Sequence, residues 1–511
     1  MKVALLYPVW TGDYGLFGHF ARRASVWPPT NLALLAAVAQ QHGHEAVIID
    51  GEVERLSQDQ LVDRAIRESP DIIGLTAYSP FFHLNVDLAT ALKKRAPDIP
   101  IVIGGPHITI MKEKAFMPCF DYLFVGEAEK SFPQFLKYYP RMIVTDGVDG
   151  KRDYGYVKGI IFREKQPNGR PKIANTGDPE PLSLVSTTGK TVGQHYPLDQ
   201  FPFPARELLP MHKYKMGSLH GRLNFTSIQT MRGCPWKCIF CASEALNTTR
   251  MVMRSPASVV DEIRSVVDTF GIRHFYIVDD VMTLWPKHIL EIVRGLKREN
   301  IKITFEGGTR ANLVEDKLFA ELAEAGLIRI SFGLETVDTE MRKTMGKKVP
   351  LEAYTEANKI CNKYGIEALN SVMIGLPGET RETVKATLDW LGKDRNVKQA
   401  NFAIAMPYPG TEFADIAAAG AHGIELTSSD YSDYRRYGSA VTKVGDLTPE
   451  DLIQLQNEGF VSIYSAWWRW WPVYKKHGIM GLMLQLLRLG RMWKWKLTRS
   501  AKPVTVHPNL S

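Results

Sequence analysis

Three cysteines stand close together in the middle of this chain, with the spacing Cys-x3-Cys-x2-Cys. Cys234, Cys238 and Cys241 are three of only five cysteines among 511 residues. Cysteine thiolates are the usual ligands of iron–sulfur clusters, and thiolates this close in sequence can face one metal centre. Because no fourth cysteine lies nearby, a [4Fe-4S] cluster bound here would keep one iron open, as catalytic metal sites do. The spacing therefore predicts a catalytic cluster.

Other uses of the three cysteines are weaker alternatives. A structural zinc site normally has four protein ligands, and neither histidine nor cysteine occurs in the thirty residues after Cys241. An electron-transferring cluster is usually held by four cysteines. An odd number of crowded cysteines disfavours disulfides. Cys119 and Cys361 lie outside the motif, and we expect them to be structural.

The residues around the cysteines carry a family resemblance. The stretch Arg-Gly-Cys-Pro-Trp-Lys-Cys-Ile-Phe-Cys, residues 232–241, resembles the signature of the radical S-adenosylmethionine (SAM) enzymes. The resemblance implies that the open iron binds the amino and carboxylate groups of SAM, whose reductive cleavage yields a 5′-deoxyadenosyl radical. It also implies an external electron donor, such as a reductase, flavodoxin or ferredoxin.

Residues 206–440 alternate between strand-like runs and helical stretches. Six β/α units of this kind predict a partial (β/α)6 barrel, in which chemistry takes place at the carboxyl ends of the strands. The predicted strands are Ser227–Met231, His274–Val278, Lys302–Phe305, Ile328–Phe332, Ala368–Ile374 and Ala400–Ala405.

Charged residues follow the second and third predicted strands. Asp279 and Asp280 follow the second, where one carboxylate can accept hydrogen bonds from an ammonium group; a helix N-cap by Asp280 is the alternative. Arg310 follows the third, and its guanidinium can pair with a carboxylate. The resemblance implies that one of the two aspartates faces the amino group of SAM and that Arg310 faces its carboxylate.

The later strands end in patterns that are similar to those of the same family. Ser331-Phe-Gly-Leu-Glu335 matches a Ser-x-Gly-x-Glu element, which implies that Glu335 reaches the ribose hydroxyls. The stretch that begins at Ser371 is similar to an adenine-binding element, although Ser371 replaces its first glycine, and it implies backbone contact near Ile374. Tyr408, after the sixth strand, completes the predicted SAM site.

The first 140 residues also alternate between short apolar runs and helical stretches, which predicts a doubly wound, flavodoxin-like parallel sheet. Ligands bind such a sheet at the carboxyl ends of its strands. No Gly-x-Gly-x-x-Gly fingerprint follows the first strand. The predicted strands are Val3–Tyr7, Ala46–Ile49, Ile72–Ala77, Ile101–Gly104 and Tyr122–Val125.

The loops after these strands resemble the cobalamin-binding domain that precedes many radical SAM cores. The Asp-x-His-x-x-Gly element that supplies a cobalt-ligating histidine elsewhere is absent, and residues 12–19 do not have its spacing. The resemblance therefore implies cobalamin without a lower histidine ligand; a domain that has lost its ligand is the alternative. The candidate cobalamin residues are Thr76, Ser79, Gly104, Gly105, Gly126 and Glu127.

Two further segments complete the predicted organisation. Residues 141–205 are rich in Gly, Pro, Lys and Asp and predict a linker with one hairpin at residues 156–172. Residues 441–511 predict a helical C-terminal extension. No Asp or Glu follows Glu458, whereas nine Lys and Arg do, so the rest of the chain carries a net charge of about −1.

The acid-free tail also holds six of the eleven tryptophans. A basic amphipathic helix with tryptophan at its borders is typical of peripheral membrane contact. A helix packed on the barrel and a nucleic-acid patch are the alternatives, but we see no second cysteine cluster or RNA-binding domain and expect no nucleic acid. No apolar run is long enough to span a bilayer, and we expect a cytoplasmic protein, with the inner membrane surface as a possible peripheral location.

These observations predict a cobalamin-dependent radical SAM enzyme that modifies an unactivated carbon of a bulky hydrophobic small molecule. C-methylation is the favoured outcome. Oxidative cyclisation, as in the anaerobic magnesium-protoporphyrin monomethyl ester cyclase, is the alternative reaction. A cobalamin- or redox-sensing protein without turnover is the alternative from another class.

Overall fold

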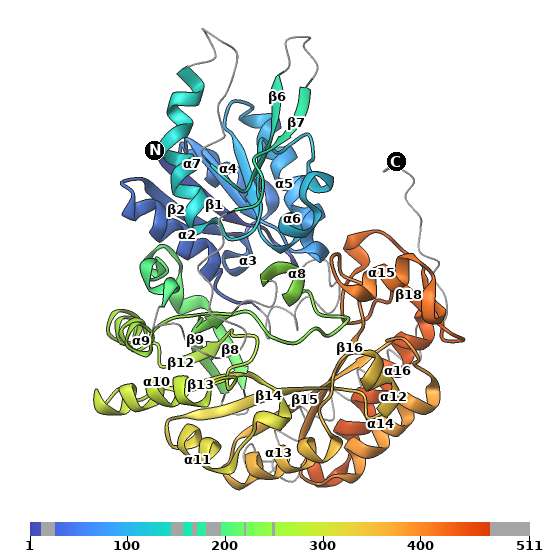
Figure 1. Cartoon of the computed structure of the whole chain (residues 1–511). Helices are drawn as coiled ribbons and strands as arrows, with labels where there is room; N and C mark the ends of the chain where they lie inside the picture. The colour runs from blue at the N-terminus through green and yellow to red at the C-terminus, as the bar shows by residue number, and fades with distance from the viewer. Residues whose placement is uncertain are drawn as a thin grey trace.

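Two mainly parallel β-sheets, each covered by helices, form the body of the protein (Figure 1). The computed structural model describes residues 1–11, 26–144, 157–165, 171–179, 196–218, 221–247 and 251–470. The N-terminal sheet lies at the top of Figure 1, the central sheet lies below it, and the short helix α8 (Ser243–Asn247) lies between them.

The N-terminal sheet has the strand order β2-β1-β3-β4-β5-β6-β7. Its first five strands are parallel and in flavodoxin-like order, as predicted. The hairpin predicted at residues 156–172 forms the antiparallel pair β6 and β7, and it extends this sheet beyond β5. The strands are β1 Lys2–Tyr7, β2 Glu45–Asp50, β3 Ile72–Thr76, β4 Ile101–Gly104, β5 Tyr122–Phe124, β6 Ile160–Lys165 and β7 Pro171–Asn175.

Helices cover both faces of this sheet because its central strands are apolar on both sides; every residue of β3 is buried. Local sequence also fixes the helix starts. Ser57 and Gln60 form a capping box at the first turn of α4, which satisfies two otherwise unpaired backbone N–H groups. The helices are α2 Thr30–Gln41, α3 Gly51–Glu54, α4 Gln58–Arg67, α5 Phe82–Arg95, α6 Pro106–Met111 and α7 Ala128–Val144.

The central sheet has the order β16-β15-β14-β13-β12-β9-β8. The six strands from β9 to β16 are parallel and β8 pairs antiparallel at the edge, which gives the predicted partial barrel. Its third strand begins and ends later than predicted, so Gly307 and Gly308 lie within the strand. The strands are β8 Lys215–Ser218, β9 Gly221–Ile228, β12 His274–Ile277, β13 Thr304–Thr309, β14 Leu327–Glu335, β15 Glu367–Ile374 and β16 Gln399–Ile404.

Helices alternate with these strands and surround the sheet. Two small antiparallel pairs lie beside it: β10 (Met231–Arg232) with β11 (Val252–Met253), and β17 (Ile424–Leu426) with β18 (Thr442–Val444). The helices are α9 Pro256–Phe270, α10 Pro286–Arg298, α11 Asp316–Glu324, α12 Thr339–Thr344, α13 Leu351–Lys363, α14 Arg381–Lys393, α15 Glu412–Ala418 and α16 Pro449–Ser465.

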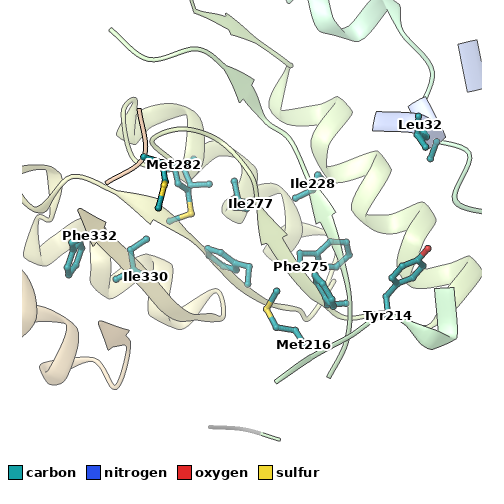
Figure 2. Close-up of a cluster of buried hydrophobic side chains, with 14 of the residues drawn as sticks. Leu32, Tyr214, Met216, Ile228, Phe275, Ile277, Met282, Ile330 and Phe332 are labelled. Atoms are coloured by element: carbon teal, nitrogen blue, oxygen red, sulfur yellow. The ribbon is translucent and has the colours of Figure 1, made fainter. Parts of the chain in front are cut away.

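One hydrophobic core joins the two sheets. The cluster runs from Leu32 in α2 to Phe332 in β14, and Figure 2 shows part of it. Two polar contacts cross the same boundary: the Tyr214 hydroxyl donates to Asp50 at 2.7 Å, and the Ala205 amide donates to the Ala33 carbonyl at 2.9 Å. Burial of this much apolar surface favours a fixed arrangement of the two sheets.

The described chain ends against the amino-terminal side of the barrel strands. The Arg469 guanidinium is buried there and donates to the carbonyls of Leu391 (2.6 Å) and Val397 (3.1 Å), in the segment that leads into β16. Residues 471–511, which carry most of the basic aromatic tail, lie outside the described residues. No helix in the described part is long and apolar enough to cross a membrane.

Candidate active site

The three cysteines lie in one loop between the sheets. This cysteine loop, residues 233–242, runs from β10 into α8, and α8 packs against α6 of the N-terminal sheet. Cys234, Cys238 and Cys241 are all partly exposed, and the Cys241 amide donates to the Cys238 carbonyl at 2.9 Å. Burial raises the pKa of the Cys241 thiol to about 11, so an electropositive partner must be present for it to ionise.

The loop fits a cluster better than a single ion. Among the described residues, no three His, Cys, Asp or Glu side chains converge as the ligands of a single metal ion would. A cubane has a different requirement, because each cysteine binds a different iron atom. Three partly exposed thiols in one loop meet that requirement.

The two aspartates after β12 have different surroundings. Asp279 is buried, and its carboxylate accepts from the backbone N–H of Thr230 (2.7 Å) and of Met231 (3.0 Å) and from the Thr230 hydroxyl. Burial raises the pKa of Asp279 to about 6. Asp279 therefore holds the strand that leads into the cysteine loop and has little capacity left for a ligand.

Asp280 is exposed; its carboxylate accepts from the Ser243 hydroxyl at 3.0 Å and from the backbone of Gly233, the first residue of the cysteine loop. Burial raises the pKa of the Cys234 and Cys241 thiols, and the negative charge of the nearby Asp280 adds to this rise. The alternative of a helix N-cap is wrong: α10 begins at Pro286, and its N-cap residue is Trp285. Of the two predicted carboxylates, Asp280 is the one that is free to face an ammonium group.

Arg310 is held over the cysteine loop. Its guanidinium stacks on the ring of Trp236, which lies between the first two cysteines, at 4.1 Å. The residue is 9% exposed, and its buried Nε atom has no hydrogen-bond partner among the described residues. A buried guanidinium N–H without an acceptor is costly, and a ligand carboxylate would supply the acceptor. This position fits the prediction for Arg310.

Glu335 has a partner that the sequence did not predict. Its carboxylate forms an ion pair with the Lys347 ammonium at 2.7 Å, and both side chains are buried. Glu335 lies at a bulge in β14 with a φ of 63°, a conformation that few residues other than glycine adopt. Lys347 follows α12 in a Met-Gly-Lys-Lys stretch, which contains no recognisable signal for this pairing.

Three other predicted SAM residues lie on β14, β15 and the loop after β16. Ser331 is in the middle of β14, and its side chain is hydrogen-bonded to Tyr276 of β12. Ile374 ends β15, and its carbonyl accepts from the Ala405 amide at 2.7 Å, so the strand pairing already uses that oxygen. The Tyr408 hydroxyl donates to the Tyr434 carbonyl at 3.0 Å, which ties the loop after β16 to a later segment.

The candidate cobalamin loops surround a close backbone approach at the end of β4. A Cβ on Gly105, whose φ is 101°, would lie 2.9 Å from the N and O of Ala77, so glycine is required there. Gly104 precedes it as the last residue of β4. The Thr76 hydroxyl accepts from Asn31 Nδ2 at 3.1 Å.

Ser79 and His107 form a second contact between these loops. The Ser79 hydroxyl lies 3.0 Å from His107 Nδ1, and burial lowers the pKa of His107 to about 4, so this histidine is neutral at ordinary pH. The His107 ring packs on Phe82 and on Tyr431 of the C-terminal part, which indicates a structural role. Residues 12–19 lie outside the described residues.

The loop after β5 is joined to the cysteine loop by an ion-pair cluster. Arg232, the last residue of β10, contacts Glu127 at 2.7 Å through Nη1 and Glu129 at 2.6 Å through Nη2. The Gly126 amide, in the same loop, donates to the Thr109 hydroxyl at 3.0 Å. Glu127 therefore connects the two domains, a role that its sequence position did not indicate. Arg232 and Glu129 carried no prediction.

Two family models match the chain. The model of the Radical SAM superfamily matches residues 228–391, and that of the B12 binding domain matches residues 19–136. An uncharacterized methyltransferase of Pyrococcus horikoshii is 30% identical over 441 residues, which cover 86% of this chain and 88% of the relative. The anaerobic magnesium-protoporphyrin IX monomethyl ester cyclase of Rubrivivax gelatinosus is 28% identical over 81% of this chain and 69% of its own length.

Among solved structures, the fold is similar to that of the radical SAM methyltransferase TsrM from Kitasatospora setae, solved with cobalamin and a [4Fe-4S] cluster bound. The TM-score is 0.66 at 18% identity, and the match covers 91% of this chain and 88% of the other. At this identity the likeness concerns the fold.

Proposed function

The chain belongs to the cobalamin-binding radical SAM enzymes, whose cofactors are a [4Fe-4S] cluster, SAM and cobalamin, and from that premise we propose that it methylates an unactivated carbon of a bulky hydrophobic small molecule. One observation carries the proposal. The cysteine loop and the loops of the N-terminal sheet face each other and are joined through Arg232, so two cofactors bound there would act on one substrate.

The proposed roles follow from the contacts of each residue. Cys234, Cys238 and Cys241 would hold three irons of the cluster. Asp280 would accept from the amino group of SAM, and Arg310 would pair with its carboxylate through the unpartnered Nε. Bound together, the cluster and SAM supply a carbon-centred radical, and cobalamin supplies a methyl group.

Glu335, Ser331, Ile374 and Tyr408 would border the nucleoside part of SAM. Glu335 would bind the ribose from its ion pair with Lys347. On the other side of the gap, Thr76, Ser79, Gly104, Gly105 and Gly126 would line the cobalamin site with small and hydroxyl groups. Radical SAM enzymes take their electron from a donor protein, for which we propose a reductase, flavodoxin or ferredoxin.

Two exposed apolar side chains support a hydrophobic substrate. Tyr78 follows β3 of the N-terminal sheet and is 41% exposed. Val278 follows β12 of the barrel and is 37% exposed. Both therefore lie at the carboxyl ends of strands, where ligands bind in these folds. An apolar molecule between the sheets would cover them.

The similarity to the magnesium-protoporphyrin cyclase favours oxidative cyclisation as the second candidate reaction. The products separate the two reactions. Methylation from cobalamin produces both S-adenosylhomocysteine and 5′-deoxyadenosine, whereas cyclisation produces 5′-deoxyadenosine without the homocysteine product. A non-catalytic sensor would release neither.

The test is anaerobic reconstitution of the full chain with iron, sulfide and hydroxocobalamin, followed by SAM, dithionite and an extract of apolar metabolites. We expect 5′-deoxyadenosine and S-adenosylhomocysteine, together with a metabolite heavier by one methyl group. The matched control replaces all three motif cysteines by alanine and leaves Cys119 and Cys361 in place. Release of 5′-deoxyadenosine without the homocysteine product would replace methylation by cyclisation.

We also propose a cytoplasmic enzyme whose tail touches the anionic inner membrane surface. The support is compositional: nine Lys and Arg, no acidic residue after Glu458, and clustered tryptophans. Such contact would bring the enzyme close to apolar substrates that dissolve in lipid.

A further inference from the structure

The segment before Lys347, residues 345–346, packs closely against the backbone of the cysteine loop. The Ile239 amide, directly after the second cysteine, donates to the Met345 carbonyl at 3.3 Å. Gly346 has a φ of 70°, and a Cβ there would lie 2.6 Å from the carbonyl oxygen of Lys237. No side chain at 346 fits that gap, so the two segments can pack only through glycine. Lys347 is the next residue in the chain, and the same added Cβ on Gly346 would lie 4.0 Å from the Cα of Cys238.

The Lys347 ammonium is a buried cation. The residue is 7% exposed, and its Nζ is 2.7 Å from Glu335 Oε1. Its ion pair with the buried Glu335 carboxylate keeps the ammonium charged inside the protein. A buried charge interacts more strongly with its neighbours than an exposed one because little water screens it.

The absence of a side chain at Gly333 leaves space in the barrel for the ion pair between Glu335 and Lys347. A Cβ on Gly333 would clash with both Glu335 Oε1 and Lys347 Nζ, so a side chain at this position would displace the ion pair. The hydroxyl of Tyr354 donates to the Gly333 carbonyl at 2.7 Å and fixes the strand behind the pair. The ion pair is therefore built into the barrel wall and is not a surface contact.

We propose that Lys347 is a positioning residue of the cysteine loop that places a fixed positive charge beside Cys238 and thereby raises the reduction potential of the cluster. The potential of an iron–sulfur cluster depends on the charge and hydrogen bonding around its thiolates. Reduction adds one negative charge, which a nearby buried cation stabilises. This inference rests on the proposed function, in which Cys238 is a cluster ligand.

The test is a potentiometric titration of the reconstituted full-length protein without SAM, followed by the electron paramagnetic resonance signal of the reduced cluster. Lys347→Met removes the charge and keeps much of the side-chain length, and Lys347→Arg keeps the charge. Lys343→Met is the matched control, because Lys343 is an exposed lysine four residues away that pairs with Glu340 on the surface. Iron and sulfide content are measured for every variant.

We expect Lys347→Met to lower the midpoint potential by about 59 mV or more, a tenfold change in the reduction equilibrium of a one-electron couple. Lys347→Arg and Lys343→Met should stay close to the wild-type potential. Lys347→Met alone leaves the buried Glu335 carboxylate without its cation, which could prevent folding. The double variant Lys347→Met with Glu335→Gln removes both charges and avoids this problem. Its potential should lie between those of Lys347→Met and the wild type.

A wild-type potential in Lys347→Met, or in the double variant if the single one does not fold, would overturn the inference. Failure of the proposed function gives a different result. If the wild-type protein itself bound no cluster, or bound it equally well with Cys238 replaced by alanine, the cluster assignment would fail irrespective of the behaviour of Lys347.

Discussion

Replacing Asp279 tests whether its carboxylate stabilises the fold or binds a ligand. Its carboxylate accepts from two buried backbone N–H groups, those of Thr230 and Met231, immediately before the strand that carries the cysteine loop. Asp279→Ala leaves both donors unpaired. An unsatisfied buried donor costs about 1–3 kcal/mol, and removal of a buried charge returns part of that. We therefore expect a loss of about 2–4 kcal/mol in the free energy of unfolding.

Asp279→Asn should cost much less, about 1 kcal/mol, because the amide oxygen can still accept from both N–H groups and only the charge is lost. The neighbouring Asp280→Asn is the matched control. Asp280 is exposed, and an amide oxygen at this position can still accept from Ser243 and Gly233, so its replacement should leave the stability nearly unchanged and weaken SAM binding.

The assay combines denaturant unfolding of the cluster-free protein with iron content and SAM binding after anaerobic reconstitution. We expect Asp279→Ala to lower stability and iron content together. The opposite pattern would refute the reasoning: normal stability and iron content in Asp279→Ala with SAM binding lost, and normal SAM binding in Asp280→Asn. Asp279 would then be the carboxylate that binds the ligand.

Four further changes have defined outcomes. Arg232→Met leaves the buried Glu129 without its cation and should lower the free energy of unfolding by about 3 kcal/mol. Adding Glu127→Gln and Glu129→Gln to this variant should restore most of the loss. An unchanged denaturation midpoint in the single variant would show that the ion pairs do not hold the two domains together. Arg310→Met keeps the packing on Trp236 but removes the guanidinium that would pair with the SAM carboxylate. At normal iron content, SAM should bind this variant about 10- to 100-fold more weakly in equilibrium dialysis. Equal affinity would show that Arg310 does not bind SAM. Burial raises the pKa of Glu379 from 4.5 to about 7, so between these values the folded protein holds a proton that the unfolded chain releases. The free energy of unfolding should therefore fall as pH rises from 4.5 to about 7. Glu379→Gln should make this pH dependence less steep in denaturant titrations, and an equally steep dependence would contradict the burial argument. Truncation after Trp470 should abolish co-sedimentation with vesicles that contain anionic lipid, while neutral vesicles and the full chain serve as controls; continued sedimentation would place the contact elsewhere.

The sequence predicted those parts of the site that depend on one strand at a time. Parallel strands bring their carboxyl ends to one edge, so strand order alone predicts that Asp280, Arg310 and Glu335 lie at the same edge of the barrel. The choice between Asp279 and Asp280 could not be made. Adjacent residues of one chain have opposite surroundings here, and only the position of the Thr230 backbone distinguishes them.

Ion pairs between distant segments were also beyond the sequence. Arg232 and Glu127 are 105 residues apart and meet only because the two sheets pack together. Lys347 reaches Glu335 through a turn whose geometry depends on Gly346. Charged residues of this kind look like ordinary surface positions in a sequence, because no periodicity marks a contact between separate elements.

The position of Arg469 has a consequence for what the tail can control. The guanidinium fixes the exit of the chain beside the segment that leads into β16, behind the barrel, whereas the candidate cofactor loops lie at the opposite strand ends. The segment that follows Arg469 is therefore attached at the amino-terminal ends of the barrel strands, away from the candidate cofactor loops. Loss of that segment would therefore leave the contacts of the candidate cofactor loops intact, so a defect in the truncated protein would report on membrane contact, as proposed above, and not on cofactor binding.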